Sequence, residues 1–235
     1  MVLVSINGEI APPTISVTDR GFLFGESIYE VIPIYNNRPF HIEKHLLRLQ
    51  LSFKALYAHT LCIQEIKHWI LDYLNQVPRN SCRALYIQMT TGDMLIRNHI
   101  QTPFTPTCII HQSFHEEPSI HEYKSGFKAV LNPDTRSALA QFKTTQLSLN
   151  TAALIKAQKY GYDEAIFHKD NHITEAASSN FFAVINNTLR TPPLGNIVPG
   201  ITRQSILSLA EKEGIPICTS PIMTSELKYA SEIFL

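Results

Sequence analysis

Val2–Ile6 alternates between apolar and polar residues, which is the pattern of a half-buried β-strand, and Ser27–Tyr35 is a second predicted strand. Asn7-Gly8 interrupts this pattern, and Asn-Gly is a strong two-residue hairpin turn. Asn36-Asn37 interrupts it again in the same manner. The alternation therefore predicts two hairpins, made of strands Val2–Ile6, Glu9–Ala11, Ser27–Tyr35 and Arg38–Phe40.

From Glu43 the apolar residues recur at helical spacing instead. One helix is predicted around Leu46–Leu56, and a second around Ile66–Leu74 that ends before Pro78. Later helices are expected over Asn150–Tyr160, which Gly161 stops, and between Gly200 and Gly214. Strands return at Arg83–Thr91, Thr107–Phe114, Phe127–Leu131, Glu164–His168, His172–Thr174 and Asn180–Ile185.

The polar stretch His115–Gly126 has no periodicity and is the best candidate for a connection between two lobes. Runs of strands mixed with runs of helices favour an α+β fold. We therefore predict a small N-terminal domain over 1–117, a linker over 118–126 and a C-terminal domain over 127–235.

Composition narrows the class of protein. The chain has 235 residues, of which 44% are hydrophobic, with 20 basic and 20 acidic side chains. That is enough chain to bury a real core, and the apolar content excludes a disordered or fibrous protein. A net charge of zero argues against binding to nucleic acid or to an anionic membrane, because both require a positive field. A globular protein that acts on small molecules remains.

Neither metal binding nor export is indicated. Cys62, Cys82, Cys108 and Cys218 form no C-x-x-C pair, and the paired histidines lack the H-E-x-x-H arrangement, so we predict no metal. No basic residue precedes Arg20, which excludes a secretory signal, and no apolar run is long enough to span a bilayer. Unpaired thiols are typical of a reducing compartment, and we expect a cytoplasmic protein.

Two segments could hold a ligand in the C-terminal half. Pro199-Gly200 precedes a helix, where backbone N–H groups and the helix dipole suit a phosphate group, and the Thr202 hydroxyl could add a bond. The polar run Thr174–Asn180 stands just before an apolar strand and carries one carboxylate, Glu175. By itself this run is more typical of a loop that hydrogen-bonds its own backbone than of a ligand site.

Two further sites have basic residues. Arg97 and His99 lie two apart, so in an extended segment both point the same way and could clamp a carboxylate. Taken alone, the two residues favour a solvated loop over such a clamp. Lys143 stands among mostly neutral residues, and a deprotonated lysine there could form a Schiff base.

These features occur in the order of a known family. The chain resembles the class IV, fold-type IV, pyridoxal-phosphate enzymes, which include D-amino-acid aminotransferase, branched-chain aminotransferase and aminodeoxychorismate lyase. The resemblance implies a small N-terminal α/β lobe and a larger C-terminal lobe with a β-barrel-like sheet. The segments that carry it are Asp19–Val31, His45–Leu49, the run around Lys143, Gly161–Ile166, Ile173–Phe181 and Pro199–Arg203.

The resemblance implies a role for each matching residue. Lys143 would form the Schiff base with pyridoxal 5′-phosphate and move the proton during catalysis. Glu175 would face the pyridine nitrogen, where a carboxylate favours the protonated, electron-withdrawing ring. The remaining cofactor ligands implied are Arg48, Ile201 and Thr202 for the phosphate, and Ser179 and Asn180 for the ring or for Glu175.

The resemblance also bears on the substrate. Tyr29, Arg97 and His99 match the carboxylate trap of the D-amino-acid aminotransferases, in which the Arg-x-His loop comes from a partner subunit. We therefore expect a homodimer that transfers an amino group from a D-amino acid to a 2-oxo acid. Thr144–Ser148 lacks the Asn-Tyr usual after the lysine in branched-chain enzymes, and it also lacks the Asn common in D-amino-acid enzymes.

Alternatives therefore stay open at this point. Aminodeoxychorismate lyase uses the same cofactor residues to release 4-aminobenzoate and pyruvate, and a branched-chain-type aminotransferase is a third reading. The final strand, Ser231–Leu235, normally leads into a loop that touches the phosphate. The C-terminal domain is thus expected to be truncated, and a non-catalytic family member is a rival interpretation.

Overall fold

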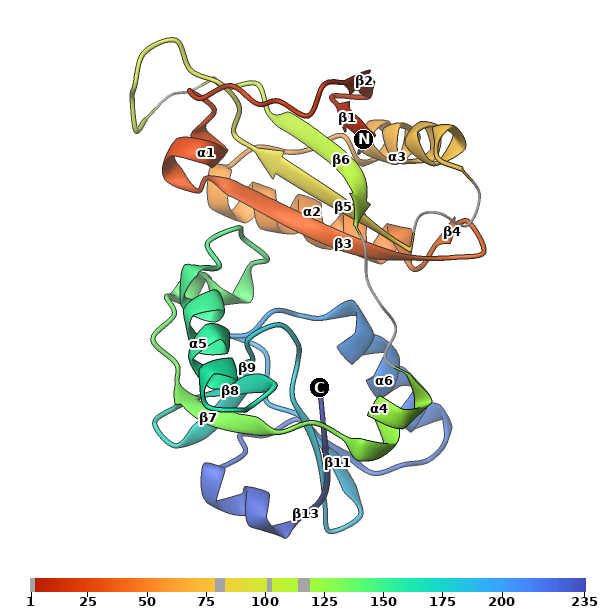
Figure 1. Ribbon diagram of the computed structural model, residues 1–235, viewed down its shortest axis with the longest axis vertical. Coiled ribbons are helices and arrows are strands. Elements are labelled where there is room, and N and C mark those ends of the chain that lie inside the picture. The colour runs from red at the N-terminus through yellow and green to blue at the C-terminus, as the bar shows by residue number, and fades with distance from the viewer. Residues whose placement is uncertain (1–2, 79–82, 101–102, 114–118) are drawn as a thin grey trace. The chain divides into compact units, whose positions relative to one another are not determined.

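The computed structural model describes residues 3–78, 83–100, 103–113 and 119–235, and the chain forms two compact units (Figure 1). Unit 1 comprises residues 1–117 and 143–145, and unit 2 comprises 118–142 and 146–235, so the two are of nearly equal length. Residues 143–145 thus belong with the N-terminal unit, which the sequence did not predict. Val2, Cys82, Phe114 and Pro118, on which parts of the predictions fall, lie outside the described residues.

Unit 1 is built on a six-stranded antiparallel sheet with the strand order β2-β1-β6-β5-β3-β4. Its helices are α1 (Arg20–Phe24), α2 (Ile42–Tyr57) and α3 (Ile63–Gln76). The sequence predicts α2 and α3 but not α1. The strands are β1 (Val4–Ile6), β2 (Glu9–Ala11), β3 (Ser27–Tyr35), β4 (Arg38–Pro39), β5 (Ala84–Thr90) and β6 (Thr107–Ser113).

The hairpins of unit 1 turn where the sequence predicts. Asn7 and Gly8 have φ of 50° and 87°, and Asn36 and Asn37 have φ of 51° and 59°. Two consecutive residues with positive φ are the signature of the turn whose twist matches that of paired strands. The two-residue polar turns therefore set the register of β1 with β2 and of β3 with β4.

The core of unit 1 lies between the sheet and the two long helices (Figure 1). Leu46, Leu49 and Phe53 of α2 are almost fully buried against residues from β3, β5 and β6. Because strand side chains alternate, the residues of β3 between those core positions lie on the opposite face of the sheet. Tyr29 is half-buried there, whereas its neighbours Ile28 and Glu30 are buried on the core side.

Unit 2 contains two sheets. One has the order β7-β8-β9, with β7 and β8 parallel, and the other has the order β12-β11-β10-β13. The strands are β7 (Ala129–Pro133), β8 (Glu164–Lys169), β9 (His172–Ala176), β10 (Phe182–Ile185), β11 (Thr188–Arg190), β12 (Ile217–Cys218) and β13 (Ala230–Phe234).

The helices of unit 2 cover these sheets. Ala153 and Ala157 of α5 (Ser148–Lys159) pack on Ala165 and Phe167 of β8. Ala210 of α6 (Ile201–Lys212) packs in a cluster with residues of β10 and β11. The other helices are α4 (Ile120–Ser125) and the 3₁₀ helices η1 (Ala138–Gln141) and η2 (Thr224–Tyr229).

The fold class agrees with the sequence-based expectation of an α+β protein, but α4, like α1, was not predicted. The stretch predicted to be an aperiodic linker contains the short helix α4. A six-residue helix has too few turns to show a helical period in sequence. No helix within the described ranges is long and apolar enough to cross a bilayer.

Replacing Phe53 with Ala should destabilise unit 1 by about 3–5 kcal/mol, because the ring is 0% exposed and its removal leaves a cavity. Urea denaturation followed by Trp69 fluorescence measures this, since the single tryptophan packs against the same core. The control is Leu51→Ala on the same helix, which is 58% exposed and should change stability by no more than about 0.5 kcal/mol. Equal losses for both variants would contradict this account of the core.

Candidate active site

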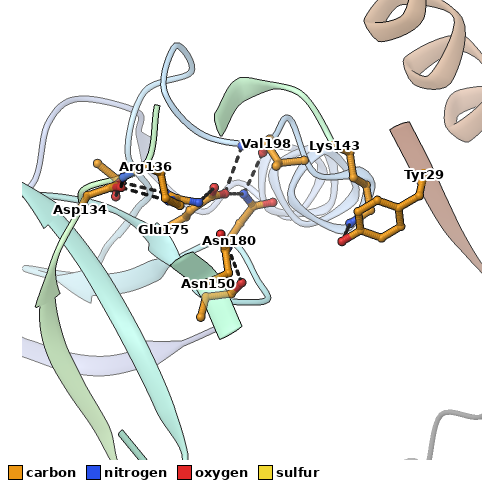
Figure 2. A network of polar contacts seen from close by, with 10 residues as sticks. Tyr29, Asp134, Arg136, Lys143, Asn150, Glu175, Asn180 and Val198 are labelled. Carbon is orange, nitrogen blue, oxygen red and sulfur yellow. Dashed lines mark hydrogen bonds and ion pairs between the residues drawn. The ribbon is translucent and has the colours of Figure 1, made fainter. Parts of the chain in front are cut away.

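Lys143 is held in unit 1 by pairing with strand β3. The Tyr29 N–H donates to the Lys143 carbonyl (2.9 Å), and the Thr145 N–H donates to the Ser27 carbonyl (3.3 Å). The Lys143 side chain then lies along Tyr29, with Nζ 3.3 Å from the tyrosine hydroxyl and 4.3 Å from the ring centroid (Figure 2). The backbone pairing and the aromatic ring together fix the position of the amine, and Lys143 stays half-buried.

Tyr29 belongs to a row of aromatic and polar side chains on the same face of the sheet. Its ring stacks on Tyr86 of β5 at 5.6 Å, and Tyr86 stacks on His111 of β6 at 4.9 Å. Burial raises the pKa of Tyr86 to about 12, so its hydroxyl keeps its proton and donates to Gln88 (2.9 Å). The sequence offered no signal for this row beyond the alternation of the strands.

A hydroxyl pair continues this row to the lysine segment. The Gln88 amide donates to the Ser27 hydroxyl (3.2 Å), which hydrogen-bonds the Thr145 hydroxyl. Thr145 follows Lys143 by two residues. Side chains of β3 and β5 therefore support the segment that carries the lysine, in addition to its backbone hydrogen bonds.

Arg97 and His99 lie together in the loop that follows β5. The Arg97 guanidinium lies 5.4 Å from the centroid of the Phe24 ring, and the His99 ring meets the same ring edge-on at 4.9 Å. Both side chains belong to exposed residues. The side chains of Arg97 and His99 thus point the same way, as their spacing suggested, and both contact Phe24 at the end of α1.

Arg20 fixes the backbone of this loop through hydrogen bonds. It is 4% exposed and donates to the carbonyls of Asn98 (2.7 Å) and His99 (3.0 Å). A bidentate pair with Glu26, with both bonds at 2.9 Å, holds the guanidinium. The Asp19 carboxylate caps α1 by accepting from the Gly21 N–H (2.7 Å). The Asp19–Val31 motif thereby places the Arg97 loop, a role that sequence analysis did not assign to Arg20 or Glu26.

Arg48 of α2 makes a buried ion pair with Glu30 of β3. Its Nε and Nη2 donate to the two carboxylate oxygens at 2.7 and 2.6 Å, and His45 Nδ1 lies 2.7 Å from the same carboxylate. Burial alone would raise the pKa of Glu30, but the hydrogen bonds from Arg48 and His45 outweigh it and the pKa is lowered. The structure thus places Arg48 with Glu30, on the face of β3 opposite Tyr29, and its role as a phosphate ligand stays a prediction.

In unit 2, Glu175 of β9 lies at the centre of a polar network (Figure 2). Arg136 Nη1 donates to one carboxylate oxygen (2.7 Å), and the Asn180 amide (3.2 Å) and the Val198 N–H (3.1 Å) donate to the other. Burial raises the pKa of Glu175 to about 7, against the lowering effect of Arg136 and of the Val198 N–H. Burial thus raises the pKa of this carboxyl more than its hydrogen-bond partners lower it.

Sequence analysis identified Glu175 and Asn180 but missed Arg136 and its partner Asp134. Arg136 binds Asp134 through Nε (3.0 Å) and Nη2 (2.8 Å). A usable signal existed, because a carboxylate and a guanidinium two residues apart directly follow strand β7. It is the same spacing that drew attention to Arg97 and His99.

The turn between β9 and β10 holds the other predicted residues of this region. The Ser179 carbonyl accepts from the Ala176 N–H (2.8 Å), which closes the turn, and Ser178 donates to Glu164 (2.7 Å). Asn180 then links the turn to the segment before α6 by donating to the Val198 carbonyl (2.9 Å).

Helix α6 begins beside Asn180. Gly200 is its N-cap and, lacking a side chain, provides no capping bond to the first N–H groups, which include those of Ile201 and Thr202. A Cβ on Gly200 would stand 1.8 Å from Asn180 Oδ1, so only glycine fits at this approach. The structure therefore brings together Glu175, Ser179, Asn180, Ile201 and Thr202 within unit 2, and Tyr29 with Lys143 within unit 1.

Gly200→Ala should lower the stability of unit 2 by about 1–3 kcal/mol. The backbone of Gly200 (φ −62°) accepts alanine, so the loss comes from the clash with the Asn180 side chain. Thermal unfolding of Gly200→Ala, Asn180→Ala and the double variant measures it. The double variant should be less destabilised than the sum of the single variants, because removing the amide removes the clash. Strict additivity would contradict the proposed contact.

The chain is similar to known proteins over most of its length. The amino-transferase class IV family matches residues 27–235. A D-alanine aminotransferase of Staphylococcus aureus is 32% identical, with 100% of this chain and 85% of that protein covered.

Two solved structures share the fold. A 4-amino-4-deoxychorismate lyase from Pseudomonas aeruginosa has a TM-score of 0.86 at 22% identity, covering 99% of this chain and 86% of that one. The Escherichia coli branched-chain amino acid aminotransferase has a TM-score of 0.85 at 24% identity, covering 99% and 81%. The resemblance drawn from the motifs is thereby confirmed: the chain belongs to the class IV aminotransferases, a family of enzymes that depend on pyridoxal 5′-phosphate.

Proposed function

We propose that this enzyme transfers an amino group from a D-amino acid to a 2-oxo acid, with Lys143 as the residue that holds pyridoxal 5′-phosphate. The observation that carries the reaction is the fixed amine of Lys143 against Tyr29. Relatives named D-alanine aminotransferase, which align over at least 94% of this chain, support the choice of substrate.

The residues present fit the cofactor in kind. Lys143 offers a primary amine, the start of α6 offers N–H groups at the positive end of a helix dipole for a phosphate, and Glu175 offers a buried carboxylate for a ring nitrogen. Glycine at position 200 lets the start of the helix approach Asn180 closely. Ile201 and Thr202 would thus bind the phosphate, and Ser179 and Asn180 would support the ring and Glu175. Arg48 is proposed as a further ligand of the phosphate.

When bound, pyridoxal phosphate supplies the carbonyl that accepts the amino group and the ring that withdraws electrons from the substrate α-carbon. Lys143 Nζ then removes the proton at that α-carbon and returns a proton on the way to product. Tyr29 keeps Nζ in place for this transfer, since it binds the amine through both its hydroxyl and its ring face. Glu175 stabilises a protonated ring nitrogen through its negative charge.

Arg97, His99 and Tyr29 are proposed to bind the substrate carboxylate. A guanidinium forms bidentate, charge-assisted bonds with a carboxylate, and an imidazole can add another donor. The loop is suited to this task because Arg20 fixes its backbone at Asn98 and His99. Selection for the D-configuration would follow from which side of the α-carbon the carboxylate occupies when Lys143 takes the proton.

We further propose that the enzyme works as a homodimer. Leu95, Ile96 and Ile100 flank Arg97 and His99, and these three residues are 102%, 80% and 83% exposed. Three large apolar residues on one loop are costly to leave in water and favour burial by a second copy of the chain. The loop would then deliver Arg97 to the substrate of its partner.

Lys143→Ala should lower the rate of D-alanine transamination with 2-oxoglutarate by about 10²–10⁴-fold, because the group that moves the proton is lost. The variant should also lack the cofactor that borohydride fixes covalently to the wild-type chain. Lys156→Ala, at an exposed position of α5, is the control and should behave as wild type. Covalently fixed cofactor in Lys143→Ala would rule out Lys143.

A parallel assay with aminodeoxychorismate separates this proposal from the lyase. Formation of D-glutamate from 2-oxoglutarate supports the transaminase. Release of 4-aminobenzoate and pyruvate without D-glutamate would replace the proposed reaction with the elimination.

Arg97→Met should raise the KM for D-alanine roughly 10- to 100-fold, which corresponds to the loss of a charged hydrogen bond, with a smaller effect on kcat. Steady-state kinetics measures both constants. Arg38→Met is the matched control, since Arg38 is exposed on β4. An unchanged KM in Arg97→Met would remove this residue from the carboxylate site.

The same variant tests the partner's contribution. At D-alanine concentrations well below the wild-type KM, where Arg97→Met is nearly inactive, mixing it with Lys143→Ala and allowing subunit exchange should restore roughly a quarter of wild-type activity, because mixed dimers rebuild one complete site. No recovery in mixtures shown to contain mixed dimers would mean that Arg97 acts within its own chain.

A further inference from the structure

Among the described residues, Arg136 is the only basic side chain that donates to Glu175, and other contacts fix its orientation. Nε and Nη2 of Arg136 both donate to the Asp134 carboxylate, so Nη1 is directed at Glu175. Phe167 of β8 supports the guanidinium, whose carbon lies 4.4 Å from the ring centroid. Asp134 and Phe167 therefore hold the Arg136 guanidinium in the orientation in which Nη1 reaches Glu175.

Asp134 is itself fixed in place. The Thr174 hydroxyl donates to it (2.8 Å), and its own N–H donates to the His168 carbonyl (2.7 Å). Burial would raise the pKa of Asp134, but the hydrogen bonds from Arg136 and Thr174 outweigh burial and the pKa is lowered. Asp134 thus keeps its negative charge and acts as a permanent anchor for Arg136.

One guanidinium therefore serves two buried carboxylates. The side chains of Arg136, Asp134 and Glu175 are 8%, 6% and 4% exposed, so water screens their charges only weakly. Asp134 accepts two of the three hydrogen bonds, and Glu175 receives one. The other donors to Glu175, from the turn before β10 and the segment before α6, are the neutral Asn180 amide and Val198 N–H.

We propose that Arg136, clamped by Asp134, is the positioning residue that sets both the orientation and the charge of the Glu175 carboxylate. This inference rests on the proposed function, in which Glu175 faces the ring nitrogen of the cofactor. Asp134 and Arg136 then act through Glu175 without touching the reacting atoms. Asp134 competes with Glu175 for the positive charge of Arg136. The pKa of Glu175 is therefore higher than it would be if Arg136 paired with Glu175 alone.

The arrangement predicts opposite effects for the two partners. Arg136 favours ionised Glu175, and the Asp134 charge opposes it, while burial holds the pKa of Glu175 near 7. Arg136→Met should therefore raise the pKa of Glu175 by about 1 pH unit or more. Asp134→Asn should lower it, because the repulsion ends and the guanidinium is released toward Glu175. A residue needed only for folding would not produce shifts of opposite sign.

The measurement is a pH titration by carbon-13 NMR of the full chain labelled at glutamate carboxyl carbons, freed of cofactor with hydroxylamine. Glu175→Gln identifies the signal by its disappearance. Arg190→Met is the matched control, because Arg190 pairs with Glu226 (2.5 Å) in the same unit and should leave the Glu175 titration unchanged. Circular dichroism confirms that each variant is folded.

Two results would overturn the inference: an unchanged Glu175 titration in folded Arg136→Met, or shifts of the same sign in Arg136→Met and Asp134→Asn. If Arg136→Met does not fold, Asp134→Asn decides by itself, since it retains the guanidinium. Repeating the wild-type titration with pyridoxal phosphate bound tests the proposed function separately. Contact with a protonated ring nitrogen should lower the pKa of Glu175, whereas an unaffected signal would displace Glu175 from the cofactor and leave the Arg136 result standing.

Discussion

The pairing of residues 143–145 with β3 is the constraint on which the candidate active site depends. Two backbone hydrogen bonds attach this segment to β3, in a sheet whose strands all lie within the first 117 residues. Lysine side chains have many rotamers, so an amine becomes a defined reactant only where its backbone and its tip are both held. Here β3 holds the backbone, and Tyr29, one position along the same pairing, holds the tip.

Buried charge is the second organising feature, and three clusters of it lie in the described part of the chain. Glu30 binds Arg48 and His45, Arg20 binds Glu26, and Arg136 binds Asp134 and Glu175. A buried ion pair contributes little net stability, because the cost of removing charges from water offsets their attraction. These pairs instead fix directions: Arg20 fixes a loop backbone, and Arg136 aims at a carboxylate. Each cluster lies next to a residue with a proposed role in cofactor or substrate binding.

Regular elements could be predicted from the sequence because their signals are local. Leu46, Leu49 and Phe53 repeat at helical spacing, and Asn7-Gly8 specifies its turn by the positive φ that both residues tolerate. Short elements such as α1 and α4 escaped because five or six residues do not complete a readable period. Glu175, Asn180 and Gly200 were identified from local motifs. The steric reason for glycine at 200 is the close approach of the Asn180 side chain, which only the tertiary structure shows.

The sequence by itself determined the α+β class, the long helices, the hairpin turns and the family to which the motifs belong. The tertiary structure alone decided which charged groups meet: Arg20 with the backbone at 98 and 99, Arg136 with a glutamate 39 residues away, and Lys143 with a tyrosine 114 residues away. Periodicity records only which face of an element a side chain occupies. Which side chains then come within hydrogen-bond distance depends on the register and packing of segments distant in sequence, and no local pattern records that.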